Sequence, residues 1–510
     1  MKKGDLVALE IVDLAFGGKG IAKTEDGLVV FVDGALPGQK IEAKISLNKK
    51  KYAEAKLVQV LERSPNERVT KFQAIPGAPW ANLPIETQQE YKKHQVFELF
   101  QKFSDSDLNE KFDEYISSPN EWFYRNKMEY SFGPTTESFT LDAEGKKVWA
   151  HTGYALGSKK RGQYWLVENL EKPSGIFDED FETFLPQIRE FCESTGKGVY
   201  NQKTNKGFFR HLVVRKSFMT DSFLINLVTV DEAFDIDAFT RIMVNRFGPR
   251  IAGIMWTKHS GVADRTNQVG TRTLVHGQGT VMEELNGLRF EMSIDSFFQT
   301  NPKSAEKLYG KVASYVNSKA KSKILDLFCG TGTIGQIVAR KLEKVSVTGV
   351  EIVASAVKDA RKNVERNKIE NVKFVCADVK NFFNSHKESG YETIIIDPPR
   401  AGIIPKALRK VLEFGAPNLL YVSCNPATMA RDTATILKAG YKLEKFSLVD
   451  QFPHTAHVEC IGKFVIGFSC PPGNMGAKDY SIVLIQLLEC LRKCFFFQSF
   501  KRSFLKFQYI

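Results

Sequence analysis

The chain has 510 residues, of which 43% are hydrophobic and 25% charged, and its formal net charge is +12. Such a length exceeds one compact core and predicts about two to four domains, with the composition of a soluble globular protein. The opening residues do not resemble a signal peptide, and charged side chains interrupt the apolar stretch 482–497. We therefore expect a cytoplasmic protein without a membrane span, and the charge favours a polyanionic partner.

The eight cysteines form no CxxC pair and show no spacing typical of a disulfide framework. This pattern is typical of a reducing compartment. A structural zinc site is not expected.

Residues 1–63 alternate apolar and polar side chains in short runs broken by glycine-containing turns, which predicts a small β-barrel. Six lysines are concentrated in one part of it: Lys40, Lys44, Lys49, Lys50, Lys51 and Lys56. They could form a cationic wall for nucleic acid, or they could protect a solvated strand edge.

Residues 64–118 are expected to be a linker followed by a helix over 86–103. Residues 119–295 mix short strands, turns and a few helices and are expected to form a central domain of α+β type. Within it, the runs 122–127 and 200–211 interleave aromatic and basic residues. Such runs can stack unpaired bases and hold phosphates, or they can simply belong to a core.

From residue 323 the chain alternates strands and helices. The expected strands are 324–328, 345–350, 372–376, 391–396 and 419–423, and the expected helices begin at 334 and 405 or span 354–367 and 427–439. This alternation predicts a parallel sheet covered by helices, which binds ligands beyond the carboxyl ends of its strands.

The first of these strands leads into the glycine-rich segment 326–335, which contains GxGxxG, and Glu351 stands at the tip of the next strand. A dinucleotide oxidoreductase would share both features. Two later strand ends carry Asp397–Arg400 (Asp-Pro-Pro-Arg) and Ser423–Pro426 (Ser-Cys-Asn-Pro). Hydride transfer needs neither, whereas methyl transfer to an unactivated ring carbon needs a nucleophile, so S-adenosylmethionine fits better than NAD.

Together these motifs resemble those of the RNA uridine-5 (m5U) methyltransferases, in particular the TRAM-domain-containing 23S rRNA (uracil-5-)-methyltransferase type. The resemblance extends from Lys3 to about Gly467 and includes Ser296–Asn301 and Phe452–Glu459. It implies an α/β fold: a C-terminal Rossmann-like S-adenosylmethionine-dependent methyltransferase domain (296–469), an N-terminal OB-like TRAM barrel that binds RNA (1–63), and a central RNA-binding domain.

The resemblance also implies the roles of individual residues. Cys424 would be the nucleophile and Glu459 the general base. The cofactor S-adenosyl-L-methionine would be bound by Gln299, Phe328, Thr333, Glu351, Asp378 and Asp397.

The chemistry explains why a thiol and a carboxylate suffice. Addition of the Cys424 thiolate to C6 of uracil makes C5 nucleophilic enough to take the methyl group, and a base such as Glu459 then removes the C5 proton. Taken alone, a cysteine at a strand end is more often a small buried hydrophobe. The thiolate needs positive potential, for which Arg431 on the following helix is one candidate.

Other polar residues near these motifs have competing interpretations. His454 and His457 lack further ligands for zinc and are expected to orient their loop or the uracil. Arg400 fits a phosphate contact or a structural ion pair equally well. Cys329 is expected to be a packing residue rather than a second nucleophile.

Two segments depart from the family. Several relatives hold an iron–sulfur cluster with four cysteines, but 71–80 and 167–170 contain none, so no iron–sulfur cluster and no metal are expected. The tail 470–510 has no counterpart and is expected to be atypical, in the sense of a weakly ordered extension or a contact segment.

The favoured function is methylation of uracil C5 in ribosomal RNA, with transfer RNA as the alternative substrate. A catalytically silent RNA-binding protein is a further alternative, although Cys424 and Glu459 are both present. The target uracil is expected to be extracted from its stack before attack. A monomer without membrane association is expected.

Overall fold

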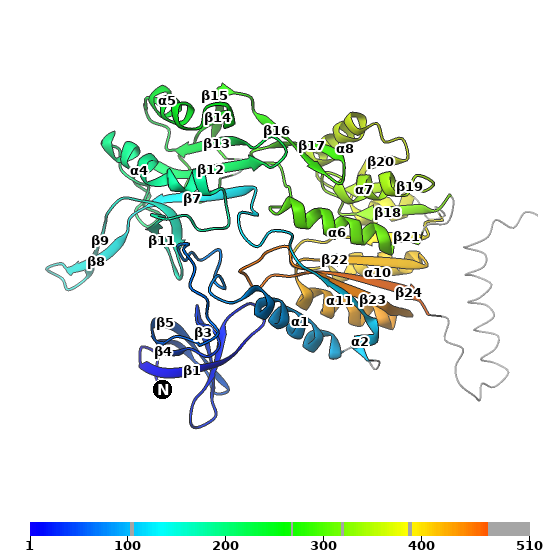
Figure 1. Ribbon diagram of the computed structural model, residues 1–510, viewed down its shortest axis with the longest axis horizontal. Coiled ribbons are helices and arrows are strands. Elements are labelled where there is room, and N and C mark those ends of the chain that lie inside the picture. The colour runs from blue at the N-terminus through cyan, green and yellow to red at the C-terminus, as the bar shows by residue number, and fades with distance from the viewer. Residues whose placement is uncertain (103–106, 267–268, 318–320, 386–389, 468–510) are drawn as a thin grey trace, which may run out of the picture. The chain divides into compact units, whose positions relative to one another are not determined.

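The computed structural model describes residues 1–102, 107–266, 269–317, 321–385 and 390–467 (Figure 1). The described residues form two compact units. Unit 1 comprises 1–102, 114–266, 269–310 and 447–459, and unit 2 comprises 107–113, 311–317, 321–385, 390–446 and 460–467. The prediction for the tail 470–510 lies outside the described residues.

Unit 1 begins with a closed barrel of five strands in the order β1-β2-β3-β5-β4, as the sequence predicts. The strands are β1 (Leu6–Leu14), β2 (Gly20–Lys23), β3 (Val29–Asp33), β4 (Lys40–Asn48) and β5 (Tyr52–Glu62). Alternate residues of β4 point inwards, so that Ile41, Ala43 and Ile45 are buried and Lys44 is exposed. This period of two closes the hydrophobic core of a small barrel.

A helix follows the barrel, α1 (Ile85–Gln101), with Pro84 at its N-cap position. The buried side chains of α1 include three polar ones, Gln88, Lys92 and Gln95. A helix normally buries apolar side chains, so buried polar groups require specific partners. The next elements are α2 (Leu108–Lys111) and β6 (Phe112–Ile116).

The central part of unit 1 contains a seven-stranded sheet in the order β11-β10-β7-β12-β13-β14-β15. Its strands are β7 (Lys127–Gly133), β10 (Ala155–Lys160), β11 (Gln163–Asn169), β12 (Phe209–Ser217), β13 (Ser222–Thr229), β14 (Ile251–Lys258) and β15 (Thr271–Gly277). Phe181 and Ile188 of the helices share its core with Phe223. These helices are α3 (Glu179–Thr183), α4 (Leu185–Ser194) and α5 (Ile236–Phe247), the last followed by the 3-10 turn η1 (Gly248–Arg250).

Two hairpins accompany this sheet. The hairpin of β8 (Thr136–Leu141) and β9 (Lys147–Thr152) lies between β7 and β10 in the chain and extends away from the sheet (Figure 1). The second hairpin consists of β16 (Thr280–Leu285) and β17 (Leu288–Ser293), and α6 (Pro302–Tyr315) follows it. The mixed α+β character expected for this region is confirmed.

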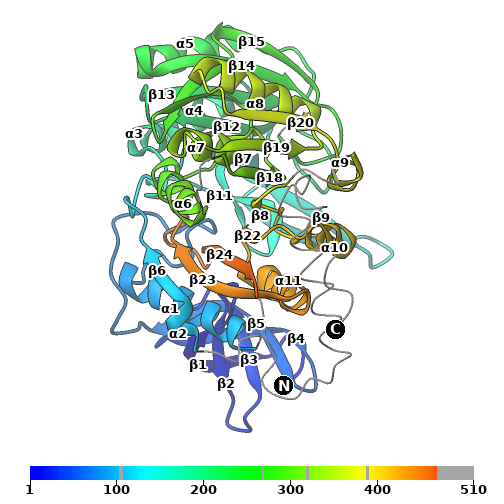
Figure 2. The same cartoon turned by 90° about the vertical axis from the view of Figure 1, so that its right-hand side faces the viewer.

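The last sheet has eight strands in the order β20-β19-β18-β21-β22-β24-β23-β6 (Figure 2). Its strands after β6 are β18 (Lys323–Leu327), β19 (Ser346–Glu351), β20 (Val372–Cys376), β21 (Thr393–Ile396), β22 (Asn418–Ser423), β23 (Tyr441–Val449) and β24 (Glu459–Ile466). Between them lie α7 (Thr333–Lys341), α8 (Ala354–Asn367), α9 (Val379–Ser385), α10 (Pro405–Phe414) and α11 (Pro426–Lys438). Strands β18 to β22 are parallel.

The sequence predicts this last sheet closely. The helix over 354–367 and the strand over 372–376 have the expected bounds, and the other predicted strands differ by up to two residues at an end. The short helix α9 and three strands of this sheet, β6, β23 and β24, were not predicted. The Rossmann-like architecture with an N-terminal OB-like barrel is confirmed.

Candidate active site

The parallel strands of the last sheet carry five of the predicted site residues at one edge. Each residue ends a strand or follows its carboxyl end: Phe328 after β18, Glu351 in β19, Asp378 after β20, Asp397 after β21 and Cys424 after β22. Because adjacent parallel strands end at the same edge of a sheet, the fold gathers these residues from distant parts of the sequence.

The glycine-rich loop after β18 has a conformation that its sequence requires. Gly332 has φ +76°, and a Cβ atom there would meet the Phe374 ring at 2.2 Å. The amide of Gly330 donates to Glu351 Oε2 at 3.1 Å, and the amide of Val353 donates to Oε1 at 2.9 Å. The carboxylate of Glu351 therefore ties this loop to the end of β19.

Thr333, the first residue of α7, follows that loop. Its hydroxyl oxygen lies 3.4 Å from that of Thr331. Asp378 follows the carboxyl end of β20. Its Oδ1 accepts a hydrogen bond at 2.9 Å from the amide of Asn381, which lies in the first turn of α9.

Two acidic residues near this edge have raised pKa values. Asp326 in β18 is completely buried, and burial together with the charge of Asp397 raises its pKa to about 8. Loss of hydration also raises the pKa of Asp397, to about 7. A Cβ atom at Gly335 would come within 2.9 Å of Asp326 Oδ2, so this glycine lets α7 approach the buried carboxyl group.

The segment around Cys424 is held mainly by nearby residues. Asn425 caps α11, because its Oδ1 accepts from the amide of Ala427 at 3.2 Å. Asn425 Nδ2 donates to the carbonyl of Arg400 at 3.1 Å, and Ser423 Oγ donates to the carbonyl of Asn425 at 3.0 Å. Cys424 itself is half-buried immediately before the N-terminus of α11.

Arg431 of α11 stabilises the loop that follows Asp397. Its guanidinium donates to the carbonyl of Ala401 at 3.1 Å and to Asp432 at 2.8 Å. Asp432 also accepts from the amide of Ile403 and from the Tyr421 hydroxyl at 2.7 Å. The predicted source of positive potential is therefore engaged in holding the neighbouring loop.

The antiparallel pairing of β22 and β24 fixes the register of the two predicted catalytic residues. Ser423 pairs with Cys460. Cys424 follows the first of these residues and Glu459 precedes the second, so both stand at the same end of this strand pair. Glu459 is 3% exposed.

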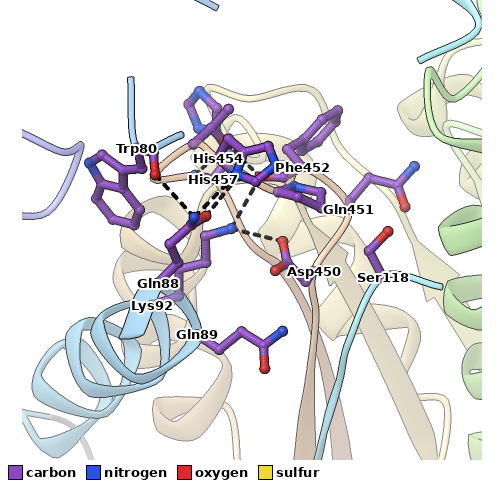
Figure 3. A network of polar contacts seen from close by, with 12 residues as sticks. Trp80, Gln88, Gln89, Lys92, Ser118, Asp450, Gln451, Phe452, His454 and His457 are labelled. Atoms are coloured by element: carbon purple, nitrogen blue, oxygen red, sulfur yellow. Dashed lines mark hydrogen bonds and ion pairs between the residues drawn. The ribbon is translucent and has the colours of Figure 1, made fainter. Parts of the chain in front are cut away.

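The loop before Glu459 is held by α1 and by Trp80, which precedes α1 in the chain (Figure 3). The amide of His454 donates to Gln88 Oε1 at 2.7 Å, while Gln88 Nε2 lies 3.2 Å from His454 Nδ1. The carbonyl of His454 accepts from the amide of Trp80 at 2.9 Å. His454 has φ +65°, a left-handed conformation that these bonds help to maintain.

A buried ion pair lies one helical turn further along α1 (Figure 3). Lys92 Nζ donates to Asp450 Oδ1 at 2.8 Å, and both side chains are fully buried. Lys92 also donates to the carbonyl of Phe452 at 3.1 Å. Burial lowers the pKa of Lys92, and the charge of Asp450 opposes that shift. The sequence predicts the helix but contains no local signal for these two anchors.

His454 is neutral in this environment. Burial, reinforced by the charge of Arg68, lowers its pKa to about 3. Its ring stacks on Trp122 with centroids 3.7 Å apart. The expectation that His454 orients its own loop agrees with these contacts, and no cluster of three or more potential metal ligands occurs among the residues that the structure describes.

Gln299 lies in unit 1, apart in the chain from the other predicted cofactor residues. Its carbonyl accepts from Asn126 Nδ2 at 3.1 Å, and the carbonyl of Thr300 accepts from the Asn126 amide at 2.7 Å. The following residue, Asn301, exchanges hydrogen bonds with Gln451 at 3.1 and 3.0 Å. The Ser296–Asn301 motif is thus fixed by the same loop that leads to Glu459.

The two aromatic and basic runs place part of their side chains in the interior, whereas Lys203 and Lys206 of the second run are exposed. Phe208, Phe209 and Arg210 are no more than 2% exposed, and Tyr124 is 1% exposed. Core packing is the interpretation that the structure favours for these side chains. The most exposed aromatic residues of unit 1 lie outside these runs: Phe16, Phe139, Trp149, Tyr164 and Phe297.

Comparison with known proteins identifies the family. Residues 272–465 match the model described as tRNA (uracil-5-)-methyltransferase, and residues 2–58 match the TRAM domain. An RNA methyltransferase of Clostridium tetani is 35% identical over 466 residues, which cover 90% of this chain and 98% of the relative. One from Clostridium acetobutylicum is 36% identical over 470 residues, with the same shares covered.

The chain belongs to the RNA uracil-5-methyltransferases.

A solved structure supports the assignment to this family. The tRNA (uracil-54, C5)-methyltransferase of Pyrococcus abyssi, in complex with S-adenosyl-L-homocysteine, superposes with a TM-score of 0.67 and 25% identity, covering 90% of this chain and 100% of that one. The RNA uracil-5-methyltransferase described here uses S-adenosyl-L-methionine, as the sequence motifs indicate, and carries a TRAM domain. None of its described helices is long and apolar enough to cross a membrane.

Proposed function

We propose that this RNA uracil-5-methyltransferase methylates C5 of a uracil in 23S ribosomal RNA through a covalent adduct with Cys424. The observation that carries the proposal is the Ser423–Cys460 pairing, which puts Cys424 and Glu459 at the same end of two paired strands. A nucleophile and a base beside the carboxyl edge of the sheet can perform addition and elimination at one ring.

The residues at this edge fit an S-adenosylmethionine site. Glu351, tied to the glycine-rich loop, suits a ribose, and the exposed apolar side chains of Ile352 and Val353 beside it can cover a base. We assign cofactor contacts to Gln299, Phe328, Thr333, Glu351, Asp378 and Asp397. The cofactor supplies an electrophilic methyl group.

Cys424 would act as the thiolate. It stands one residue before Asn425, the N-cap of α11, and the partial positive charge at a helix N-terminus would stabilise a thiolate there. The thiolate would add to C6 of uracil, and the electron pair released toward C5 would form the new bond to the methyl group, while the bond between that methyl group and the cofactor sulfur breaks and its electron pair stays on the sulfur.

Glu459 would complete the reaction. After methyl transfer, C5 still carries its proton, and the carboxylate of Glu459 removes it. The electron pair of that C–H bond re-forms the C5–C6 double bond and expels the Cys424 thiolate. Product and free enzyme result, and the proton remains on Glu459 until it exchanges with solvent.

Substrate RNA would be gripped by the barrel and by the central region, which we propose as separate RNA-binding domains at 1–63 and 119–295. Lys44 and Lys56 are direct cross-strand partners in the barrel, and both are exposed. Like charges placed opposite each other weaken a sheet, so their position favours an anionic partner. A cytoplasmic monomer accords with this role.

Transfer RNA is the second candidate substrate, because the Pyrococcus abyssi enzyme acts on tRNA by its name and superposes over most of the chain. The family resemblance of a TRAM-containing chain favours ribosomal RNA. Incubation of the enzyme with unmodified 23S rRNA and tRNA transcripts and methyl-labelled cofactor, followed by mapping of labelled nucleotides, distinguishes them. Label in 5-methyluridine of rRNA is expected; label in neither RNA would refute the proposal.

A further inference from the structure

One face of the β8–β9 hairpin presents two aromatic rings to solvent. Phe139 and Trp149 are direct cross-strand partners, with ring centroids 5.1 Å apart. Each residue is 45% exposed. Large apolar side chains paired on an extended hairpin, uncovered by the rest of unit 1, are typical of a surface that meets a partner.

Lysines flank this aromatic pair. Lys147 Nζ lies 4.0 Å from the Phe139 ring centroid, on the same face of the hairpin. Lys203 Nζ, from the loop before β12, lies 5.4 Å from the Trp149 centroid and 3.9 Å from that of Trp165 in β11. The rings are therefore bordered by ammonium groups that can reach phosphates.

The acidic residues near the pair are already engaged. Glu137 Oε1 lies 3.2 Å from Lys203 Nζ and 3.0 Å from His151 Nε2, at the base of the same face. Asp142 closes the hairpin turn by accepting from the amide of Lys146 at 2.7 Å. The same ion pair partly balances the charge of Lys203, so Lys147, beside the Phe139 ring, supplies the positive charge of this face that Glu137 does not balance.

We propose that the Phe139–Trp149 face binds unpaired nucleotides of the substrate RNA, with bases stacked on the two rings and phosphates beside Lys147 and Lys203. The proposal rests on the RNA methyltransferase function and extends it by naming where single-stranded substrate is held. Bases in a duplex already stack on each other. Only unpaired bases have a free face that can stack on exposed rings of the protein, so this surface should select unpaired bases.

The opposite face of the hairpin provides a matched control. Thr140 and Val148 form the next cross-strand pair, point away from the rings and are also exposed. Changing them perturbs the same hairpin at the adjacent position without removing an aromatic group.

The test measures binding of a fluorescent uridine oligomer of about 12 nucleotides and of an RNA duplex of the same length, without cofactor. In the full chain, Phe139→Val/Trp149→Val keeps β-branched residues in the strands but removes both rings. We expect the oligomer to bind about 10-fold more weakly or worse, and duplex binding to change little. Thr140→Ala/Val148→Ala should bind both RNAs as the unchanged enzyme does.

Equal binding of the oligomer by the ring variant and the control variant would overturn the proposal, and so would an equal loss for oligomer and duplex. Retained oligomer binding would instead make this face a protein-contact surface. Limited proteolysis of the hairpin checks that it remains folded in both variants.

Methyl transfer separates this inference from the function itself. For an RNA that the unchanged enzyme methylates, the ring variant should have a KM about 10-fold higher and the same kcat, because no reacting group is altered. If no RNA were methylated even by the unchanged enzyme, the proposed function would fail, while the oligomer measurement would still decide the role of the hairpin.

Discussion

The segments that carry Cys424 and Glu459 are held in place in opposite ways. The Cys424 segment is fixed by the cap of α11 within its own motif and by the bond from Asn425 to Arg400, 25 positions away. The loop before Glu459 is fixed by α1, through the His454–Gln88 bonds between residues 366 positions apart. The segment of the proposed nucleophile is held mainly by its own motif, and that of the proposed base mainly by tertiary contacts.

This difference teaches that the two proposed catalytic residues are sensitive to different changes. The position of Cys424 depends mainly on residues of its own motif and on the loop at 400–403. The placement of Glu459 can be disturbed from α1, far from any predicted site residue.

The largest effect is expected from Cys424→Ala. It removes the group that activates uracil, so turnover and covalent capture of RNA containing 5-fluorouridine should both be abolished. Gel shift of the denatured complex measures capture. Cys192→Ala, at a buried position of the central core, is the control and should keep both activities. An active Cys424→Ala enzyme would exclude this residue as the nucleophile.

Glu459→Gln should separate the two halves of the reaction. Addition and methyl transfer remain possible, but proton removal from C5 is lost, so turnover should fall by about 10²–10⁴-fold while a methylated covalent adduct accumulates. Denaturing electrophoresis with methyl-labelled cofactor detects that adduct. Loss of turnover without any labelled protein–RNA band would argue against a role in elimination.

Lys92→Met tests the buried ion pair that holds the loop before Glu459. It leaves Asp450 buried without its main counter-charge, which should cost about 3–5 kcal/mol in the free energy of unfolding. Urea unfolding measures the loss. The double variant Lys92→Met/Asp450→Leu removes both charges and should recover much of it; no recovery would mean that the pair is not the cause.

Gln88→Leu removes both hydrogen bonds to His454 and should cost about 1–3 kcal/mol of stability. If Gln88 positions the loop for Glu459, the variant should also accumulate labelled adduct, as Glu459→Gln does. The neighbouring Gln89→Leu is the control, because Gln89 accepts a hydrogen bond from the exposed Ser117 and not from His454. Slower turnover without adduct in Gln88→Leu would limit its role to stability.

Over a single pH unit, the smallest effect is a dependence of stability on pH through His454. Its pKa is about 3 in the folded protein and near 6.5 when unfolded, so between these values the unfolded chain binds the extra proton. Stability should therefore fall as pH drops below about 6.5, by up to about 1.4 kcal/mol per pH unit from this group. His454→Asn keeps a side chain that tolerates positive φ and should lose this contribution, as shown by urea midpoints at several pH values.

Much of the eight-stranded sheet and of the candidate site could be predicted, because the sequence patterns that indicate them are local. The β/α alternation, the glycine-rich loop and the Ser423–Pro426 motif each occupy a few consecutive residues, and strand ends of a parallel sheet necessarily meet. The partners of α1 could not be predicted in this way. Gln88 and Lys92 look like ordinary surface residues of a helix until the loop at 450–454 lies against them.

The aromatic residues show the same limit. The run 200–211 and the β8–β9 hairpin both mix aromatic and basic side chains, yet Phe208 and Phe209 are buried while Phe139 and Trp149 face solvent. Composition alone does not distinguish a core strand from an exposed hairpin, because only the packing of neighbouring elements removes a ring from water.

The sequence by itself determined the family and the cofactor and predicted the thiol and the carboxylate, because each is indicated by residue types within short motifs. The tertiary structure decided the register that sets Cys424 and Glu459 at one strand end, the anchoring of the base loop by α1, and which aromatic rings remain available to RNA. These features depend on contacts between residues far apart in the chain, which no local pattern records.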